Sequence, residues 1–171
     1  MQVQLTEIPE EGLELQVSDV SWFPDSEIKR SGKLEARIFL ERRQERLMAS
    51  GSIDLVYALE CDRCLEEFNL PETIEFSLTL EQAGEADGQE AKEYQCDSSE
   101  MDVVFFEGTA VDISSILEQQ VVLAYPVKKL CAENCLGLCA GCGHNLNLGK
   151  CGCPDKSAET PFSVLGQLID K

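Results

Sequence analysis

The chain has 171 residues, 43% of them hydrophobic, which predicts one folded domain with a small appendage rather than a disordered acidic chain. Its net charge of −18 is unlike that of proteins that coat nucleic acid through many lysines and arginines. We find neither a signal peptide at the start nor a stretch of about 18 apolar residues. We therefore expect a cytoplasmic protein that does not enter a membrane.

The charge is distributed unevenly along the chain. Residues 81–107 contain nine acidic residues and one lysine, and we interpret residues 82–101 as an acidic loop. Residues 29–46 carry a net charge of +4, and residues 127–171 carry a net charge of +1. Ten basic residues from these two segments are candidates for contact with RNA or a partner: Lys29, Arg30, Lys33, Arg37, Arg42, Arg43, Arg46, Lys128, Lys129 and Lys150. For Arg37, Arg42 and Arg43, pairing with nearby glutamates is an equal alternative.

Three segments, 33–41, 53–59 and 73–81, alternate hydrophobic and polar residues and predict half-buried strands. Their buried faces would consist of Leu34, Ala36, Ile38 and Leu40, then Ile53, Leu55, Tyr57 and Leu59, then Ile74, Phe76, Leu78 and Leu80. Residues 43–45 would form a turn, and residues 103–106 would add a short strand. Consecutive strands with short connections favour an antiparallel meander or a barrel-like sheet.

Two helices are predicted after the strands. Asp112 is a typical N-cap, and the apolar residues that follow it recur at helical spacing until Pro126, so we expect a helix near 112–124. The apolar face of that helix would consist of Ile113, Ile116, Leu117 and Val121. Thr160 and Pro161 could begin a second, short helix. The prediction is an α+β fold, with an acidic, β-rich domain over 1–126 and a zinc-ribbon-like tail over 127–171.

Eight of the nine cysteines form four close pairs. Zinc is bound by four thiolates in a tetrahedron, and turns with one to three residues between cysteines would supply them in pairs. Four such pairs predict two zinc ions, with these ligands: Cys61, Cys64, Cys131, Cys135, Cys139, Cys142, Cys151 and Cys153. Disulfides or free thiols, and an iron–sulfur cluster, are the alternatives for the same residues. Cys96 and His144 are expected to play no part.

The grouping of the pairs has two solutions. The preferred one joins Cys139 and Cys142 to Cys151 and Cys153, because closing a short loop costs less entropy. The pair Cys61 and Cys64 would then meet Cys131 and Cys135 and attach the tail to the strands. In the alternative, the four residues from Cys131 to Cys142 form one site. Arg63, between the first two cysteines, could donate to a thiolate or contact RNA.

The sequence contains no catalytic constellation. With a single histidine there is no cysteine–histidine–acid arrangement outside the metal cluster, and neither a phosphate-binding loop nor a dinucleotide-binding glycine pattern occurs. We therefore predict a protein that is not an enzyme and has no small-molecule substrate.

Several segments resemble the YceD-like family of bacterial and plastid proteins. Residues 59–68, LECDRCLEEF, match its C-x-R-C-L-x-x-F signature. The tail agrees over AYPVKKLC (124–131), CLGLC (135–139) and CGHNLN (142–147), and PFSVL (161–165) agrees as well. Members differ in their number of tail cysteines, which implies that the second metal site is dispensable to the function they share. The resemblance implies a role in the accumulation of large-subunit (23S) ribosomal RNA.

The function expected from these observations is that of a non-enzymatic ribosome biogenesis factor stabilised by one or two zinc sites with four cysteines each. The acidic loop could bind a basic ribosomal protein or assembly factor. Alternatively, the basic residues could contact ribosomal RNA directly, since zinc-bound loops commonly do so. A zinc- or thiol-based redox sensor that regulates a partner interaction is the alternative function.

Overall fold

The computed structural model describes residues 1–43, 46–83 and 103–153. The chain divides into two compact units: unit 1 comprises Met1–Ala58 and Asn69–Val127, and unit 2 comprises Leu59–Phe68 and Lys128–Lys171. The segment Leu59–Phe68, although flanked by unit 1 in the sequence, thus folds with the tail. The helix expected at Thr160, Cys96 and most of the predicted acidic loop lie outside the described residues.

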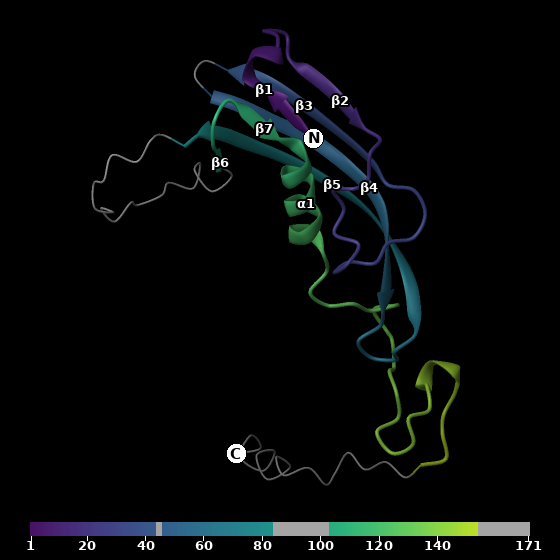
Figure 1. The fold of residues 1–171 in the computed structure, drawn as a ribbon. Coiled ribbons are helices and arrows are strands. Elements are labelled where there is room, and N and C mark those ends of the chain that lie inside the picture. The colour runs from purple at the N-terminus through teal and green to yellow at the C-terminus, as the bar shows by residue number, and fades with distance from the viewer. Residues whose placement is uncertain (44–45, 84–102, 154–171) are drawn as a thin grey trace, which may run out of the picture. The chain divides into compact units, whose positions relative to one another are not determined.

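Unit 1 is built around a five-stranded sheet (Figure 1). In order across the sheet its strands are β2 (Leu13–Val17), β3 (Glu35–Arg43), β4 (Arg46–Glu60), β5 (Glu67–Gln82) and β6 (Val103–Phe106). A separate pair is formed by β1 (Gln2–Gln4) and β7 (Ala110–Asp112). The described elements are completed by helix α1 (Ile113–Ala124) and the 3₁₀ helices η1 (Leu5–Glu7) and η3 (Leu146–Leu148).

The three predicted strands are present. Strands β4 and β5 are longer than their alternating segments, whereas β3 has the same length as its segment and begins two residues later. The twelve residues assigned to their inward faces are all buried, because a period of two places every second side chain on the same face of a strand. Strands β3 and β4 pair antiparallel from Glu35 opposite Asp54 to Arg43 opposite Arg46. The expected turn falls mainly on residues 44 and 45, which the structure does not describe.

The prediction of an antiparallel meander or barrel-like sheet was wrong in two respects. Strand β6 pairs parallel to β5, with Thr79 opposite Val103, so the sheet is mixed. A connection of a dozen or more residues can return the chain to the start of a strand, and residues 83–102 provide one, whereas the short connection between β3 and β4 enforces antiparallel pairing. The sheet is also open, with β2 and β6 as its two edges.

Three strands were not predicted: β1 and β2 near the N-terminus, and β7, which pairs with β1. Strand β2 pairs with β3 so that Leu13 lies opposite Leu40 and Val17 opposite Ala36, which continues the apolar face of the sheet. Its alternation spans only five residues, too few to stand out in the sequence. Strand β1 depends on a partner more than a hundred residues away, because Val3 lies opposite Val111 in β7.

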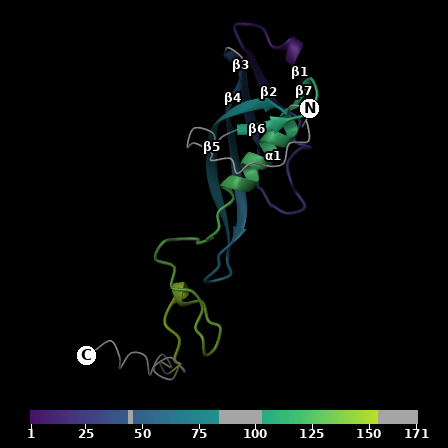
Figure 2. The same ribbon diagram turned by 90° about the vertical axis from the view of Figure 1, so that its left-hand side faces the viewer.

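Helix α1 lies on one face of the sheet (Figures 1 and 2). The Asp112 side chain caps it by accepting a 3.0 Å hydrogen bond from the Ser114 amide, and its four predicted apolar residues are buried. The hydroxyl of Tyr57 in β4 donates to the carbonyl oxygen of Val121 at 3.1 Å. The Tyr57 and Tyr125 rings meet edge to face, with centroids 5.5 Å apart. The end of α1 is thereby attached to the middle of the sheet.

Candidate metal centre

Unit 2 gathers the first four cysteines around one point. The sulfur atoms of Cys61, Cys64, Cys131 and Cys135 lie within 4.8 Å of one another. The Cys61 and Cys135 sulfurs are 3.8 Å apart, and the Cys64 and Cys131 sulfurs are 3.6 Å apart. Four thiolates at about 2.3 Å from a tetrahedral zinc ion stand about 3.8 Å from each other. The spacing of the sulfurs therefore fits one zinc ion. We call these four residues cluster 1.

A tight turn presents the first two ligands of cluster 1. The Cys61 amide donates to the Glu66 carbonyl, and the Leu65 amide donates to the Cys61 carbonyl, both at 2.9 Å. Leu65 has a φ of 60°, a left-handed conformation that is rare for a residue other than glycine. The chain thus wraps closely around the two sulfurs and directs both to the same side.

The tail is attached to this turn by a set of hydrogen bonds. The Asp62 amide donates to the Lys129 carbonyl at 2.8 Å, and the Lys129 amide donates to the Asp62 carboxylate at 2.7 Å. The guanidinium of Arg63 donates to the carbonyl oxygen of Cys135 at 2.9 Å. We predicted that Arg63 would donate either to a thiolate or to RNA. In the structure it donates to the backbone carbonyl of a cluster 1 cysteine and not to a sulfur atom.

Cluster 1 takes the place of an apolar core in unit 2. Cys61, Cys64 and Cys135 are buried, whereas Cys131 is exposed. Phe68, Leu130 and Leu138 pack against the buried cysteines. So few apolar side chains cannot stabilise the described part of unit 2, Leu59–Phe68 with residues 128–153, and a structural metal is the usual substitute.

Four further cysteines form a second group. The sulfur atoms of Cys139, Cys142, Cys151 and Cys153, which we call cluster 2, also lie within 4.8 Å of one another. The Gly141 amide donates to the Cys139 sulfur at 3.4 Å. The Gly143 amide donates to the Cys139 carbonyl at 2.8 Å, with Gly143 at a φ of 72° that favours glycine. Unlike cluster 1, cluster 2 has no buried member.

The structure thus brings the sulfurs together in the preferred grouping and not in the alternative. His144 is exposed and lies outside both clusters, and its carbonyl oxygen accepts a 2.8 Å bond from the Cys139 amide. None of these eight cysteines is in a disulfide bond, so each has a sulfur atom that can bind a metal. Their spacing is compatible with the chemistry of a soft divalent cation.

Each cluster contains at least one cysteine with a lowered pKa and at least one with a raised pKa. The backbone amide of Cys131 lowers the pKa of Cys61 to about 6, and the backbone amide of Gly141 lowers the pKa of Cys139 to about 6. The neighbouring Cys64 sulfur raises the pKa of Cys131 to about 12, and that of Cys142 raises the pKa of Cys153 to about 12. Crowded sulfurs thus resist full ionisation, and a divalent cation would supply the missing positive charge.

Asn147 is a site residue that the sequence analysis missed. Its side-chain amide donates to the Cys135 sulfur at 3.3 Å, and this bond is the main cause that lowers the pKa of Cys135. The same side chain accepts a 2.8 Å bond from the Leu136 amide. An asparagine two residues after another asparagine gives no sign of such a contact, because it depends on how the tail folds back.

Half of the predicted contact residues bond to groups of the chain itself. Five of the ten basic side chains do so: Arg30 with Asp25 at 3.4 Å, Arg42 with the Leu5 carbonyl at 3.0 Å, Arg43 with Glu41 at 2.8 Å, Arg46 with Glu81 at 3.3 Å and Lys129 with Asp62 at 3.9 Å. The remaining five are exposed: Lys29, Lys33, Arg37, Lys128 and Lys150. The alternative of pairing with glutamate therefore holds for Arg43, and Arg42 is held by a backbone carbonyl instead.

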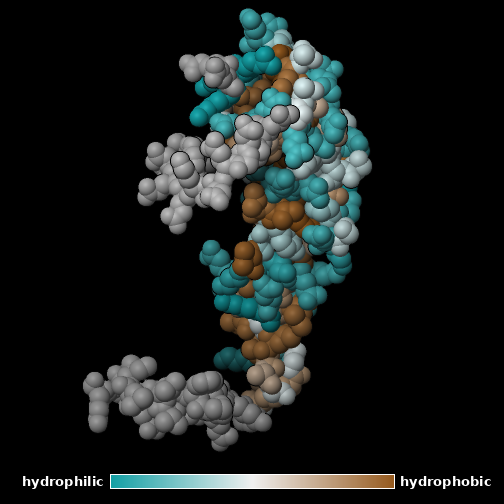
Figure 3. All heavy atoms as spheres, turned by 60° about the vertical axis from the view of Figure 1, so that its left-hand side comes forward, coloured by the Kyte–Doolittle hydropathy of each residue, from teal (hydrophilic) through white to brown (hydrophobic). Residues whose placement is uncertain are grey.

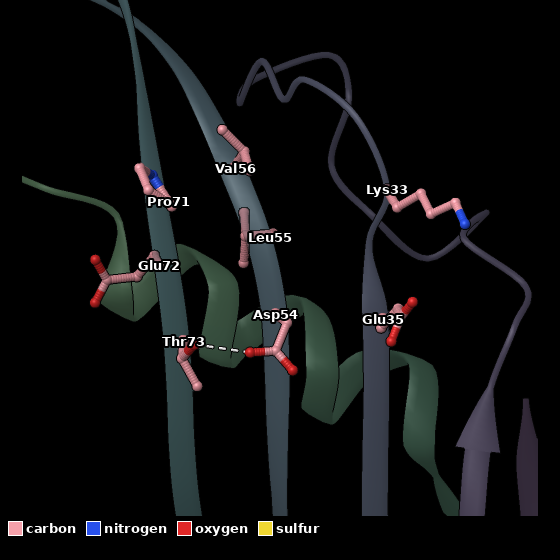
Figure 4. Close-up of a pocket in the computed structure, with 8 residues that line it drawn as sticks. All are labelled: Lys33, Glu35, Asp54, Leu55, Val56, Pro71, Glu72 and Thr73. Carbon is pink, nitrogen blue, oxygen red and sulfur yellow. Dashed lines mark hydrogen bonds between the residues drawn. The ribbon is translucent and has the colours of Figure 1, made fainter.

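A hollow on the sheet beside Lys33 is acidic (Figure 4). Strands β3, β4 and β5 contribute Glu35, Asp54 and Glu72, and Asp54 accepts a 2.7 Å hydrogen bond from the Thr73 hydroxyl. With three carboxylates and one ammonium group, this surface repels a phosphate and suits a cationic side chain.

The comparison with known proteins agrees with the cysteine pattern. A family model described as "Large ribosomal RNA subunit accumulation protein YceD" matches residues 49–169, which include both clusters. The chain belongs to the YceD family. A curated relative in Arabidopsis thaliana, "Large ribosomal RNA subunit accumulation protein YCED homolog 1, chloroplastic", is 27% identical over 172 residues. The match covers 90% of this chain but only 52% of that relative, so the chain spans about half of its length.

No solved structure matches this YceD-family chain. Among its described residues, none of the helices is long and apolar enough to cross a membrane. The relative is named as chloroplastic, and the cytoplasmic location of this chain stays a prediction. Apolar side chains reach the visible surface in patches among hydrophilic ones (Figure 3). Among the described residues of unit 2, the exposed large apolar side chains are Leu65, Leu136 and Leu148.

Proposed function

We propose that this YceD-family chain is a non-enzymatic, zinc-stabilised ribosome biogenesis factor that supports the accumulation of large-subunit (23S) ribosomal RNA. The observation that carries the proposal is cluster 1, whose three buried cysteines form the core of unit 2 within a chain that belongs to this family. The role in ribosomal RNA follows from the name of the family and of its chloroplastic relative.

Zinc is the metal we assign to both clusters. Four cysteine sulfurs with no open position are typical of structural zinc sites, whereas catalytic zinc keeps a position for water. Zinc would cross-link Leu59–Phe68 to the tail and hold unit 2 folded, as it does in other small metal-dependent domains. On this basis the protein acts by binding and not by catalysis.

A basic ribosomal protein or assembly factor is the partner that the described surface favours. Half of the candidate RNA contacts are already bonded within the chain, and the hollow around Glu35 and Glu72 is acidic. An exposed lysine or arginine of the partner would complement that hollow. Accumulation of ribosomal RNA would then follow indirectly, because correctly assembled subunits protect their RNA.

Metal analysis of the purified chain tests the zinc assignment. We expect two zinc ions per chain, and fewer than one would contradict it. The redox-sensing alternative predicts that a mild oxidant such as hydrogen peroxide releases the metal and changes the bound partners, whereas a structural site retains both ions.

A pull-down with the tagged full chain, with and without nuclease, tests the partner. We expect ribosomal or assembly proteins that remain bound after nuclease and are weakened in the variant Glu35→Lys/Glu72→Lys. Glu10→Lys, which changes an exposed charge outside the hollow, is the matched control. Loss of all partners on nuclease treatment would overturn the protein route and favour RNA contact through Lys128 and Lys150.

A further inference from the structure

The side chain of Asn147 contacts a cysteine of cluster 1. Its amide nitrogen donates to the Cys135 sulfur at 3.3 Å and to the Asn145 side-chain oxygen at 2.8 Å. Its oxygen accepts the Leu136 amide at 2.8 Å. A backbone N–H must face an oxygen, so the bond from Leu136 determines the orientation of the side chain and directs its N–H toward the sulfur.

The position of Asn147 in the chain ties this contact to the other cluster. It lies in η3, between Cys142 and Cys151, and both of these residues belong to cluster 2. Asn145 caps η3 by accepting the Asn147 amide at 3.0 Å. The loop that carries Asn147 is therefore closed at both ends by cysteines of cluster 2, while its side chain contacts a cysteine of cluster 1.

The same loop is also attached to the segment between the clusters. The Leu146 amide donates to the Gly137 carbonyl at 2.9 Å, and Leu138 pairs with Asn145 in an antiparallel bridge. The Asn145 side chain reaches further, donating to the Glu66 carboxylate at 3.3 Å next to the Cys61–Cys64 turn. These contacts hold the loop against the residues that surround cluster 1.

We propose that Asn147 couples the two clusters: metal binding at cluster 2 closes the loop that holds Asn147 against the Cys135 sulfur, and this contact tightens metal binding at cluster 1. By linkage, metal at cluster 1 favours binding at cluster 2 by the same factor. The inference rests on the proposed zinc sites but goes beyond them, because two independent structural ions would need no such contact.

The expected size of the effect follows from other metal sites. Hydrogen-bond partners of metal ligands orient the ligand and tune its charge, and their loss typically costs about 10–100-fold in metal affinity. Asn147 is thus a positioning residue, which acts on the metal through Cys135. An N–H directed at a thiolate stabilises the negative charge of that sulfur.

The first test uses single variants of the zinc-loaded full chain and a chromogenic chelator. Asn147→Ala should retain two zinc ions and release zinc from cluster 1 about tenfold faster than the parent chain. Asn147→Asp keeps the oxygen that accepts Leu136 but places a carboxylate against the sulfur, so it should release zinc at least as fast. Leu148→Ala, which truncates an exposed neighbour in η3, should match the parent chain.

Cadmium substitution assigns each effect to its cluster. Each site with four thiolates gives its own cadmium NMR signal, and a variant that lacks cluster 2 identifies the signal of cluster 1. We expect Asn147→Ala to shift the cluster 1 signal, a change that a general loss of stability would not produce. An unchanged signal together with an unchanged rate of release would overturn the proposal.

A double-mutant cycle decides whether the coupling passes through Asn147. Cys151→Ser/Cys153→Ser should leave one zinc ion, released from cluster 1 about tenfold faster, and adding Asn147→Ala should have no further effect. If Asn147→Ala accelerated zinc release in the double cysteine variant as much as in the parent chain, the coupling would be overturned, whereas the zinc assignment would stand. A parent chain with fewer than one zinc ion would instead contradict the proposed function, so the two failures are distinguishable.

Discussion

The guanidinium of Arg63 donates a 2.9 Å hydrogen bond to the carbonyl oxygen of Cys135, a residue 72 positions later in the chain. The bond links the two turns that supply cluster 1. It also gives Arg63 a structural task that does not involve a nucleic acid.

Arg63→Ala should destabilise unit 2 by about 1–2 kcal/mol, because it leaves the Cys135 carbonyl without its charged donor. Faster zinc release to a chelator would report the change. Arg63→Lys should restore only part of the stability, since an ammonium lacks the planar fork of the guanidinium. Unchanged zinc release in Arg63→Ala, combined with loss of RNA from the pull-down, would instead support the RNA-contact role.

Replacement of all four cysteines of one cluster tests the grouping. Cys61→Ser/Cys64→Ser/Cys131→Ser/Cys135→Ser should retain one zinc ion, because the four remaining ligands belong to cluster 2. The reciprocal replacement in cluster 2 should also leave one. The rejected grouping predicts that the first variant loses both complete sites, so a zinc-free protein would contradict the arrangement described above.

Removal of zinc should unfold unit 2 selectively. The single tryptophan, Trp22, is buried in unit 1 and reports on that unit alone. A strong chelator should therefore leave tryptophan fluorescence unchanged while the tail becomes susceptible to protease. Cleavage at equal rates with and without metal would show that the cysteines do not hold the unit together.

Gly137 should not tolerate alanine. It has a φ of 75°, and a Cβ atom there would lie 3.0 Å from the Arg63 carbonyl oxygen. Gly143→Ala is the matched control, because its φ is 72° but nothing lies near the added atom. We expect both variants to lose about 1 kcal/mol from the backbone and Gly137→Ala to lose more, as measured by thermal unfolding of the zinc-loaded chain.

Alkaline pH should weaken unit 1 through Tyr57. Burial raises the pKa of Tyr57 to about 12. An unfolded chain releases this proton near pH 10. The stabilisation that comes from protonated Tyr57 is therefore fully present below pH 10 and is lost as the pH rises toward 12. Urea unfolding followed by Trp22 fluorescence should show a loss on the order of 1–2 kcal/mol.

Two variants separate the contribution of Tyr57 from other alkaline effects. Tyr57→Phe should lose about 1 kcal/mol at neutral pH, from the hydrogen bond to Val121, and then decline less between pH 10 and 12. Tyr125→Phe keeps the titrating group and should retain the decline. An identical alkaline loss in Tyr57→Phe would assign the effect to other residues.

The strands and the helix of unit 1 were predictable because their signals are local. The alternation from Leu34 to Leu40 and the helical spacing from Ile113 to Val121 each depend only on which face of one element is buried. Strand β6 was also located, but its direction was not. The direction depends on the path of the chain between β5 and β6, which the short pattern at Val103–Phe106 does not encode.

The eight candidate metal ligands were likewise predictable from the sequence, because closely spaced cysteine pairs are typical of metal-binding turns. Their grouping was a preference based on loop entropy, which alone could not exclude the alternative. The folded chain selected it, because the Cys61–Cys64 turn and the tail bond to each other through Asp62 and Lys129.

By itself, the sequence determined the buried faces, the N-cap at Asp112, the four cysteine pairs and the resemblance to the YceD-like family. Only the tertiary structure decided that Leu59–Phe68 folds with the tail, that the sheet is open and mixed, and that Asn147 contacts Cys135. The physical reason is the range of the interactions. Burial patterns and metal-binding turns are properties of a few neighbouring residues. Hydrogen bonds between distant segments form only when folding brings those segments together.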